Sequence, residues 1–335
     1  LGDDEITTGS GADTISTSDG EDDISAGDGA NTITVGDGNA TIAGGEGVDT
    51  VTAGAGNNTI PLGDGADVVT AGSGDNTITN AAGNATITAG DGENTVTNTA
   101  GNSTITLGGG GNTVNLTAGN STVVTGALAD DINITAGNNS ITSGAGNDTI
   151  TLGSGNDTVD AGDGTDAVDF SVSSGTWTGS ISNAETVSVS FTGSAKVDTA
   201  GISGYTSLSV AAADDTVTTT INNLGTATLN LSDDSVESGG TGDLEALVID
   251  TTDDAEITLN LGANLNAATS AASVLGSVTI TDADAVTLKA NGGGFGNLLV
   301  MDYEGVALDD AETTSLTVEA GSDYTSLATA DITGT

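Results

Sequence analysis

The chain has 335 residues, of which 48 are acidic and only two, Lys196 and Lys289, are basic, so its formal net charge is −46. This charge repels nucleic acids and anionic membranes, and neither is expected as a direct partner. Histidine and cysteine are absent. The chain therefore lacks the usual base-activated nucleophile, and we expect no enzymatic activity. No run of about 18 apolar residues occurs, so no membrane insertion is predicted.

A nine-residue repeat runs from Thr8 to Asp169 in eighteen copies, without insertion or deletion. The cleanest copy, Gly44–Thr52, reads GGEGVDTVT, and we number its positions one to nine. Position four is glycine in every copy except at Leu128, and position eight is always Ile or Val. Leu1–Thr7 fit the end of one more copy, so we expect the chain to be a piece of a longer protein. Such strict periodicity is typical of solenoids.

The repeat predicts its own local structure. A recurring glycine indicates a turn in which a Cβ would clash. A single β-branched residue per copy indicates a short strand with one inward side chain, so each copy should be about six residues of turn and three of strand. Since that side chain needs a facing layer, two copies should form one coil of 18 residues. The sequence therefore predicts an all-β fold in which residues 1–169 form a parallel β-roll, a type of β-solenoid.

These glycine-rich nonapeptides resemble the repeats of the RTX family over about half of the chain. The resemblance implies that several calcium ions lie between successive coils, held by position-six carboxylates and by turn carbonyls. Calcium suits such sites because it accepts six to eight oxygen ligands in flexible geometry. The candidate metal ligands are Asp4, Asp13, Asp22, Asn31, Asp49, Asp67, Asp130, Asn139, Asp148, Asp157 and Asp166.

Ligands one coil apart would share a site, and the pairs vary along the chain. Two carboxylates meet in Asp4/Asp22, Asp49/Asp67, Asp130/Asp148 and Asp148/Asp166. A carboxylate and an amide meet in Asp13/Asn31, Asn31/Asp49 and Asn139/Asp157. In the middle, position six offers only Asn58, Asn76, Asn94 and Asn112 in one column and Ala85, Ser103 and Ser121 in the other.

From this pattern we hypothesise that calcium occupies both ends of the roll and is sparse or absent between about Asn76 and Asn112. There the stacked asparagine amides should hydrogen-bond to one another and to turn carbonyls. The alternative is that asparagine is simply a turn residue that tolerates left-handed backbone.

Residues 170–335 are predicted to form a second β-rich domain that could hold further calcium. Phe170 and Trp177 follow the repeats directly, and we expect them to cap the apolar core. Alternating runs predict strands at Glu185–Phe191, Ser207–Val210, Ala227–Leu231, Ala246–Asp250, Glu256–Leu261, Ser277–Thr281, Ala285–Lys289, Asn297–Met301 and Ser315–Glu319.

Acid doublets are expected to close several of these strands, at Asp214–Asp215, Asp233–Asp234, Asp253–Asp254 and Asp309–Asp310, with Asp282 and Asp284 similar. A looser β-solenoid with the doublets at its corners is favoured, and a β-sandwich with the doublets in loops is the alternative. The Ala-rich stretch Asn266–Leu275 is the one candidate for a short helix.

The composition, the roll and the strand-rich second half resemble bacterial surface-layer proteins of the RTX kind, which are secreted by the type I route. The resemblance implies an extracellular, structural protein that self-assembles into a lattice on the cell surface, with calcium locking the fold after secretion. Its partners would be copies of itself, and cell-surface polysaccharide contacted through segments outside these residues.

Two other functions stay open. In a large RTX adhesin or extracellular matrix protein, the roll would be a stiff spacer. Strands such as Thr32–Thr34 and Thr86–Thr88 also resemble ice-binding faces. Threonine is, however, a common exposed strand residue, and it occurs on both predicted sheets.

Overall fold

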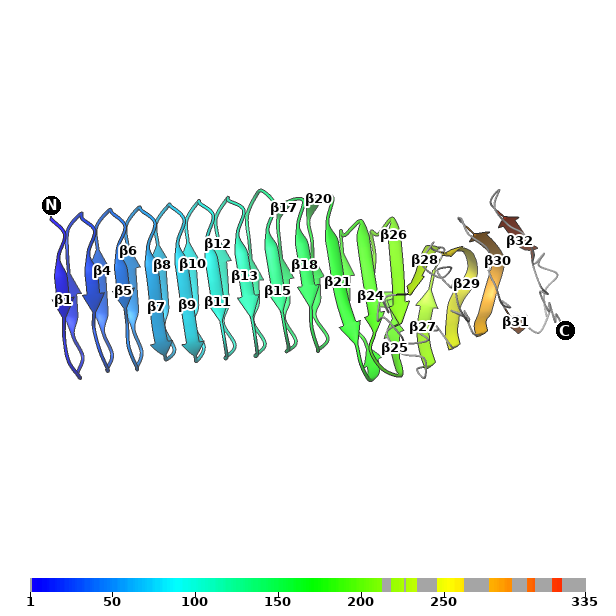
Figure 1. Ribbon diagram of the computed structural model, residues 1–335, viewed down its shortest axis with the longest axis horizontal. Helices are drawn as coiled ribbons and strands as arrows, with labels where there is room; N and C mark the ends of the chain where they lie inside the picture. The colour runs from blue at the N-terminus through cyan, green and yellow to red at the C-terminus, as the bar shows by residue number, and fades with distance from the viewer. Residues whose placement is uncertain are drawn as a thin grey trace, which may run out of the picture. The chain divides into compact units, whose positions relative to one another are not determined.

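The computed structural model describes residues 2–212, 218–225, 227–233, 246–261, 277–290, 300–304 and 315–320. The chain divides into two compact units, one formed by Leu1–Ala167 with Ile181–Ala184 and the other by Val168–Ser180 with Glu185–Thr335. In the first unit, short strands follow one another as stacked coils (Figure 1).

The first unit contains two parallel sheets, which we call sheet A and sheet B. Sheet A contains β1 (Glu5–Thr7), β3 (Asp23–Ser25), β5 (Thr41–Ala43), β7 (Thr59–Asp64), β9 (Thr77–Ala82), β11 (Thr95–Asn98), β13 (Thr113–Leu116), β15 (Asp131–Ile134) and β18 (Thr149–Leu152). Sheet B contains β2 (Thr14–Ser16), β4 (Thr32–Val35), β6 (Thr50–Ala53), β8 (Val68–Ala71), β10 (Thr86–Ala89), β12 (Thr104–Leu107), β14 (Thr122–Val124), β16 (Ser140–Thr142) and β19 (Thr158–Asp160). The two-residue strands β17 (Ala145–Gly146) and β20 (Asp163–Gly164) pair at the turns.

The register between coils is 18 residues. Ile24 pairs with Ile42 in sheet A, and Ile33 pairs with Val51 in sheet B. Two nonapeptides therefore make one coil, and the predicted parallel β-roll is confirmed.

The core contains twice as many inward side chains as the repeat predicted. Position eight is buried as expected, but position one of the following copy is buried as well, as at Val35, Leu62 and Leu116. The prediction of one inward residue per copy was wrong because many strands extend past position nine, and alternate residues of a strand point to the same face. The glycine that fills position one in the cleanest copy hid this second apolar column.

The turns depend on glycine at position four. Gly47 has φ +127°, and a Cβ placed on it would overlap the carbonyl oxygen of Gly29 in the preceding coil. The exception, Leu128, has φ +74° and is 65% exposed, so its side chain points away from the stack. The close spacing of coils is therefore set by backbone that only glycine tolerates easily.

The second unit is also built from parallel strands. They are β22 (Gly175–Trp177), β24 (Thr186–Phe191), β25 (Ala195–Asp198), β26 (Ser207–Ala212), β27 (Thr218–Leu224), β28 (Ala227–Asp233), β29 (Ala246–Leu261), β30 (Ser277–Ala290), β31 (Val300–Glu304) and β32 (Ser315–Ala320), with the 3-10 helix η1 (Thr199–Gly201) after β25. At the boundary between the units lie β21 (Ala167–Val172) and β23 (Ser180–Ser182).

The spacing of pairing partners is larger here than in the roll. Leu208 pairs with Leu229, and Leu229 pairs with Leu259. The pairings of β22 with β25, β24 with β26, β25 with β27 and β26 with β28 are parallel and join successive coils. The favoured solenoid is therefore confirmed over the sandwich as far as about residue 230, and parallel pairing continues among the described parts of β29 to β32.

The acid doublets fall at different kinds of position. Asp233 ends β28, as predicted. Asp253–Asp254 lie inside β29, where the pairing register shifts between Asp250 and Ala255, so this doublet marks a corner within one continuous strand. Asp282 and Asp284 lie at the corresponding shift in β30. Asp214–Asp215, Asp234, Asp309–Asp310 and the helix candidate Asn266–Leu275 lie outside the described residues.

Phe170 and Trp177 are both buried and stack on each other, with ring centroids 4.6 Å apart. They form an aromatic pair in the core of the second unit. Their role as a cap of the roll stays a prediction.

Replacing Gly47 with Ala should lower the midpoint of thermal unfolding in calcium, because the added Cβ meets backbone and the strained φ costs about 1–3 kcal/mol. Gly9→Ala is the matched control, since nothing lies within 4 Å of a Cβ at Gly9. Equal midpoints for the two variants, measured by circular dichroism, would contradict this account of the turns.

Candidate calcium sites

The position-six side chains of successive coils stack into two buried columns. Each column directly precedes the strands of one sheet in the sequence. Column A precedes sheet A and contains Asp4, Asp22, Ala40, Asn58, Asn76, Asn94, Asn112, Asp130, Asp148 and Asp166. Column B precedes sheet B and contains Asp13, Asn31, Asp49, Asp67, Ala85, Ser103, Ser121, Asn139 and Asp157. Only the two residues at the first coil are accessible, Asp4 being exposed and Asp13 half-buried.

Each buried carboxylate uses one oxygen to join two coils. The backbone N–H of Asp49 donates to Asp67 Oδ1 at 2.8 Å, and that of Asp130 donates to Asp148 Oδ1 at 2.8 Å. The predicted pairs are thus in direct contact, including Asp4 with Asp22 at 3.0 Å and Asp148 with Asp166 at 2.8 Å.

The second carboxylate oxygen has no protein donor at six of these aspartates. Oδ2 is buried without a hydrogen-bond partner at Asp22, Asp49, Asp67, Asp130, Asp148 and Asp157. A buried anionic oxygen without a partner is costly, and it is stabilised by a proton or by a cation.

The asparagines of the same columns show which other atoms converge at this point. Asn76 Nδ2 donates to the carbonyl oxygens of Gly72 and Gly74, at 3.1 and 2.8 Å, and to Asn94 Oδ1 at 3.0 Å. Asn31 Nδ2 likewise lies within 3.4 Å of the carbonyl oxygens of Gly27, Gly29 and Gly44. The turns that carry Asn31, Asn58, Asn76, Asn94 and Asn112 thus direct the carbonyls of positions two and four toward the position-six side chain. Where a turn of the same repeat carries Asp instead, we expect only oxygen atoms at this point.

Burial also shifts the acidity of these groups. Desolvation raises the pKa of Asp49 and Asp157 above the ordinary value, although hydrogen bonds from Asn31 and Asn139 partly oppose the shift. Desolvation raises the pKa of Asp67 and Asp130 too, although backbone hydrogen bonds from Asp49 and Asn112, respectively, partly oppose the shift, and the nearby carboxylates of Asp49 and Asp148 add a smaller increase. Without a counter-charge, ionisation of these carboxyls is less favourable than in water.

An all-oxygen cage with a buried negative charge fits calcium, which is a hard cation. Among the described residues no three acidic, His or Cys side chains cluster as a metal site, so backbone carbonyls must complete each shell. Calcium, when bound, supplies the positive charge that the buried carboxylates lack. The residues that would hold it best are the paired aspartates at either end. At Asn31 and Asn139 an amide nitrogen already donates to the surrounding oxygens.

The central part of column A is an amide ladder. Asn58, Asn76 and Asn94 each donate from Nδ2 to Oδ1 of the next asparagine, at 2.9, 3.0 and 3.1 Å, and Asn112 donates to Asp130 Oδ1 at 3.0 Å. The predicted hydrogen bonding among stacked amides and turn carbonyls is confirmed. In these turns an N–H group takes the position that a cation would take beside aspartate.

Column B uses a different substitute, which the sequence interpretation missed. Asn80 and Asn98, at position one, are buried beside the turns that carry Ala85 and Ser103. Asn80 Nδ2 donates to Asn98 Oδ1 at 2.6 Å and to the position-four carbonyl of Gly83 at 3.3 Å. The sequence did contain a signal for this substitute, because position one is asparagine at two sites 18 residues apart and is otherwise filled by small or apolar residues.

The fold and the turns define a calcium-binding parallel β-roll. Comparison with known families makes this specific, since the family described as the RTX calcium-binding nonapeptide repeat matches residues 1–33, 25–60, 62–87, 88–123 and 134–168. The chain is therefore an RTX calcium-binding nonapeptide repeat protein with a β-roll. The one longer gap between matches contains Leu128, which breaks the glycine column.

Proteins with these repeats are typically secreted, and the repeats themselves bind calcium. A search of curated proteins and a search of solved structures each found no match. Within the described ranges, no helix is long and apolar enough to cross a bilayer.

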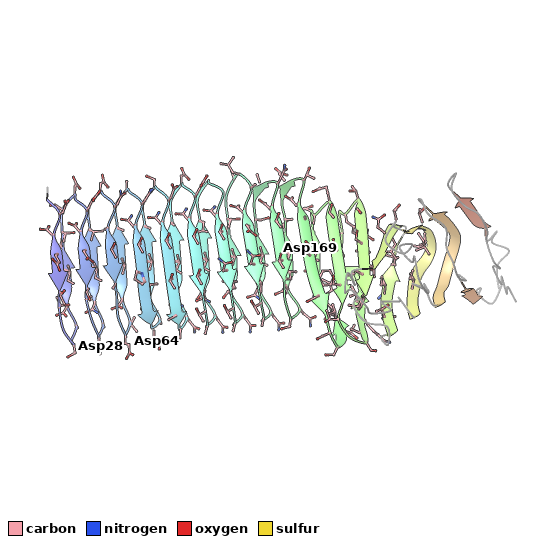
Figure 2. All side chains as sticks on the ribbon, viewed as in Figure 1. Asp28, Asp64 and Asp169 are labelled. Atoms are coloured by element: carbon pink, nitrogen blue, oxygen red, sulfur yellow. The ribbon has the colours of Figure 1, made fainter. Side chains whose placement is uncertain are left out.

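Replacing both Asp49 and Asp67 with Asn should reduce the number of calcium ions bound per chain, because the pair loses its charge and its free carboxylate oxygens. Isothermal titration calorimetry would measure this number. The matched control is Asp28→Asn with Asp91→Asn, since both carboxylates are exposed at position three, as Figure 2 shows for Asp28. An equal loss in the control would contradict the assignment of the site.

The metal-free roll should be more stable at about pH 4 than at about pH 7. The buried carboxyls have raised pKa values in the folded state. The folded state therefore binds protons more tightly than the unfolded chain, and stability is lost as pH rises through those pKa values. In excess calcium the order should reverse, since calcium binds the ionised form. Thermal unfolding at both pH values, after dialysis and with added calcium, checks this, and the same order in both conditions would refute it.

After calcium removal, backbone amides of residues 76–121 should exchange with solvent at least about tenfold more slowly than those of residues 22–67 and 130–166. The reason is that the central turns contain their own N–H donors. Hydrogen–deuterium exchange of the full chain in chelator measures this difference, and uniform exchange along the roll would contradict it.

Proposed function

We propose that this protein is a secreted structural component of a bacterial cell surface, which folds when it meets extracellular calcium and assembles with copies of itself into a surface layer. The observation that carries this proposal is the set of six buried, unpartnered aspartate oxygens along one in-register roll. Until a divalent cation binds, the negative charge of these buried carboxylates is not compensated, and the folded roll is less stable.

Charge supports the same proposal. With a net charge of −46, the metal-free chain repels itself, and low intracellular calcium would keep the ends of the roll open before export. Calcium outside the cell would then stabilise the folded coils by mass action. The roll also gives the module stiffness, because consecutive coils share a backbone hydrogen-bond ladder.

A second candidate is a large RTX adhesin or matrix protein in which the roll is a spacer. The unbroken stacking of the coils favours it, since a stiff rod separates what lies at its two ends. It differs from a surface layer in lateral order, because a spacer does not associate with its own copies. Ice binding is a third and weaker candidate, which thermal hysteresis would reveal.

Electron microscopy of the purified protein in millimolar calcium, with a chelator-treated sample beside it, tests the proposal. Ordered sheets that dissolve on chelation are the expected result. Single rod-like particles in calcium, at every concentration tried, would refute the surface-layer function and favour the spacer.

A further inference from the structure

We infer that the outer face of sheet B, between β4 and β16, is the surface through which this protein pairs with a second copy of itself. The inference deepens the proposed function and rests on it, since it names the contact through which copies would associate. We call this surface the sheet B face. Its outward residues are Thr32, Thr34, Thr50, Thr52, Val68, Thr70, Thr86, Thr88, Thr104, Thr106, Thr122, Val124, Ser140 and Thr142, all of them exposed.

The sheet B face has no charged residue on any of its strands, although the chain contains 48 acidic residues. Over the same coils the outward positions of sheet A include one carboxylate, Asp131, and the nearest outward carboxylate of sheet B is Asp160 on β19, beyond the end of this face. The position-five residues that lead into the two sheets differ in the same way. Those before sheet A include Asp3, Glu21, Asp75 and Glu93, whereas those before sheet B are Ala12, Ala30, Val48, Ala66, Asn84, Asn102, Asn120, Asn138 and Asn156.

Exposed apolar side chains gather on the same side. Val68 and Val124 are 42% and 37% exposed on the sheet B face, and Val48 is 53% exposed in the turn that leads into β6. The only other large apolar side chain exposed among the described residues is Leu128. Contact with a second copy would remove this apolar surface from water, which is favourable.

Charge decides which partner fits. Two copies of a chain with net charge −46 repel each other wherever acidic faces meet, and like charges brought together cost several kcal/mol. The sheet B face is a place where two copies can approach without bringing carboxylates into contact. Asp37 and Asp91, in the turns that follow β4 and β10, would lie at the rim, where interfaces are commonly polar.

The regular register makes this face complementary to itself. Thr70 pairs with Thr88, and Thr88 pairs with Thr106, so equivalent hydroxyls repeat at the strand spacing of about 4.8 Å. A threonine hydroxyl both donates and accepts a hydrogen bond. Two copies related by a twofold axis could therefore hydrogen-bond threonine to threonine along several strands.

The test adds three carboxylates to one sheet or the other. The face variant is Thr70→Asp with Thr88→Asp and Thr106→Asp. The control variant is Thr79→Asp with Thr97→Asp and Asn115→Asp, which places the same charges at the same repeat position on neighbouring strands of sheet A. Sedimentation velocity and electron microscopy in calcium measure association, and circular dichroism checks that both variants fold alike. Val68→Ser with Val124→Ser is a milder face variant that adds no charge.

We expect the face variant to need at least about tenfold more protein to associate than the wild type, equivalent to about 1.4 kcal/mol, and the control variant to associate normally. If the face variant assembles as well as the control, the sheet B face is not the contact, although the surface-layer function survives. If the wild type forms dimers but no larger assembly, and the face variant does not dimerise, then the sheet B face is the contact and the proposed surface-layer function is wrong. A wild type that stays monomeric refutes both, and loss of ice shaping in the face variant of such a monomer would identify ice as the occupant.

Discussion

Every feature of the roll follows from the strict 18-residue register between coils. In this register each side chain lies next to the side chain at the same repeat position in the coils before and after it. A column of isoleucine and valine gains from this arrangement, because like packs on like. A column of buried aspartate does not, because carboxylates accept hydrogen bonds and cannot donate them.

The two position-six columns contain three solutions to this conflict. At the ends, carboxylates leave an oxygen for a cation, as at Asp49 and Asp148. In the middle of column A, amide groups provide both the donor and the acceptor. In the middle of column B, Ser103 and Ser121 accept backbone N–H groups, while Asn80 and Asn98 provide amides from position one. The backbone is nearly the same in all three, so the dependence on metal is decided one side chain at a time.

The sequence predicted the roll well because its nine-residue period is visible without any structural knowledge. Isoleucine or valine at position eight defined the strands, and glycine at position four defined the turns. The second apolar column at position one was missed, since glycine, alanine, leucine and asparagine alternate there and share no chemistry. In the second unit the strands β24, β26 and β28 were located, but β22, β25 and β27 were missed, and β29 and β30 were each predicted as two strands. The pairing was not predicted, because the spacing from Leu208 to Leu229 and from Leu229 to Leu259 follows no fixed period.

The candidate metal ligands could be named from position six alone, but which oxygen is left without a donor could not. That property depends on the backbone N–H of another coil, such as Asp49 N–H with Asp67 Oδ1. The same limit applies to Asn80 and Asn98, which reach the turn from a neighbouring position and are recognised only when the coils are stacked.

The amide ladder also has a direction. Its N–H groups all point toward the C-terminal end of the column, from Asn58 through Asn112, and the last of them meets the carboxylate of Asp130. Aligned amide dipoles add, as they do along a helix, so the ladder presents its positive end to an anion. At the opposite, negative end stands Ala40, which has no charge, and its backbone N–H donates to Asn58 Oδ1. The order alanine, four asparagines, aspartate is thus electrostatically polarised, and the same residues in reverse order would set a carboxylate against the negative end of the array.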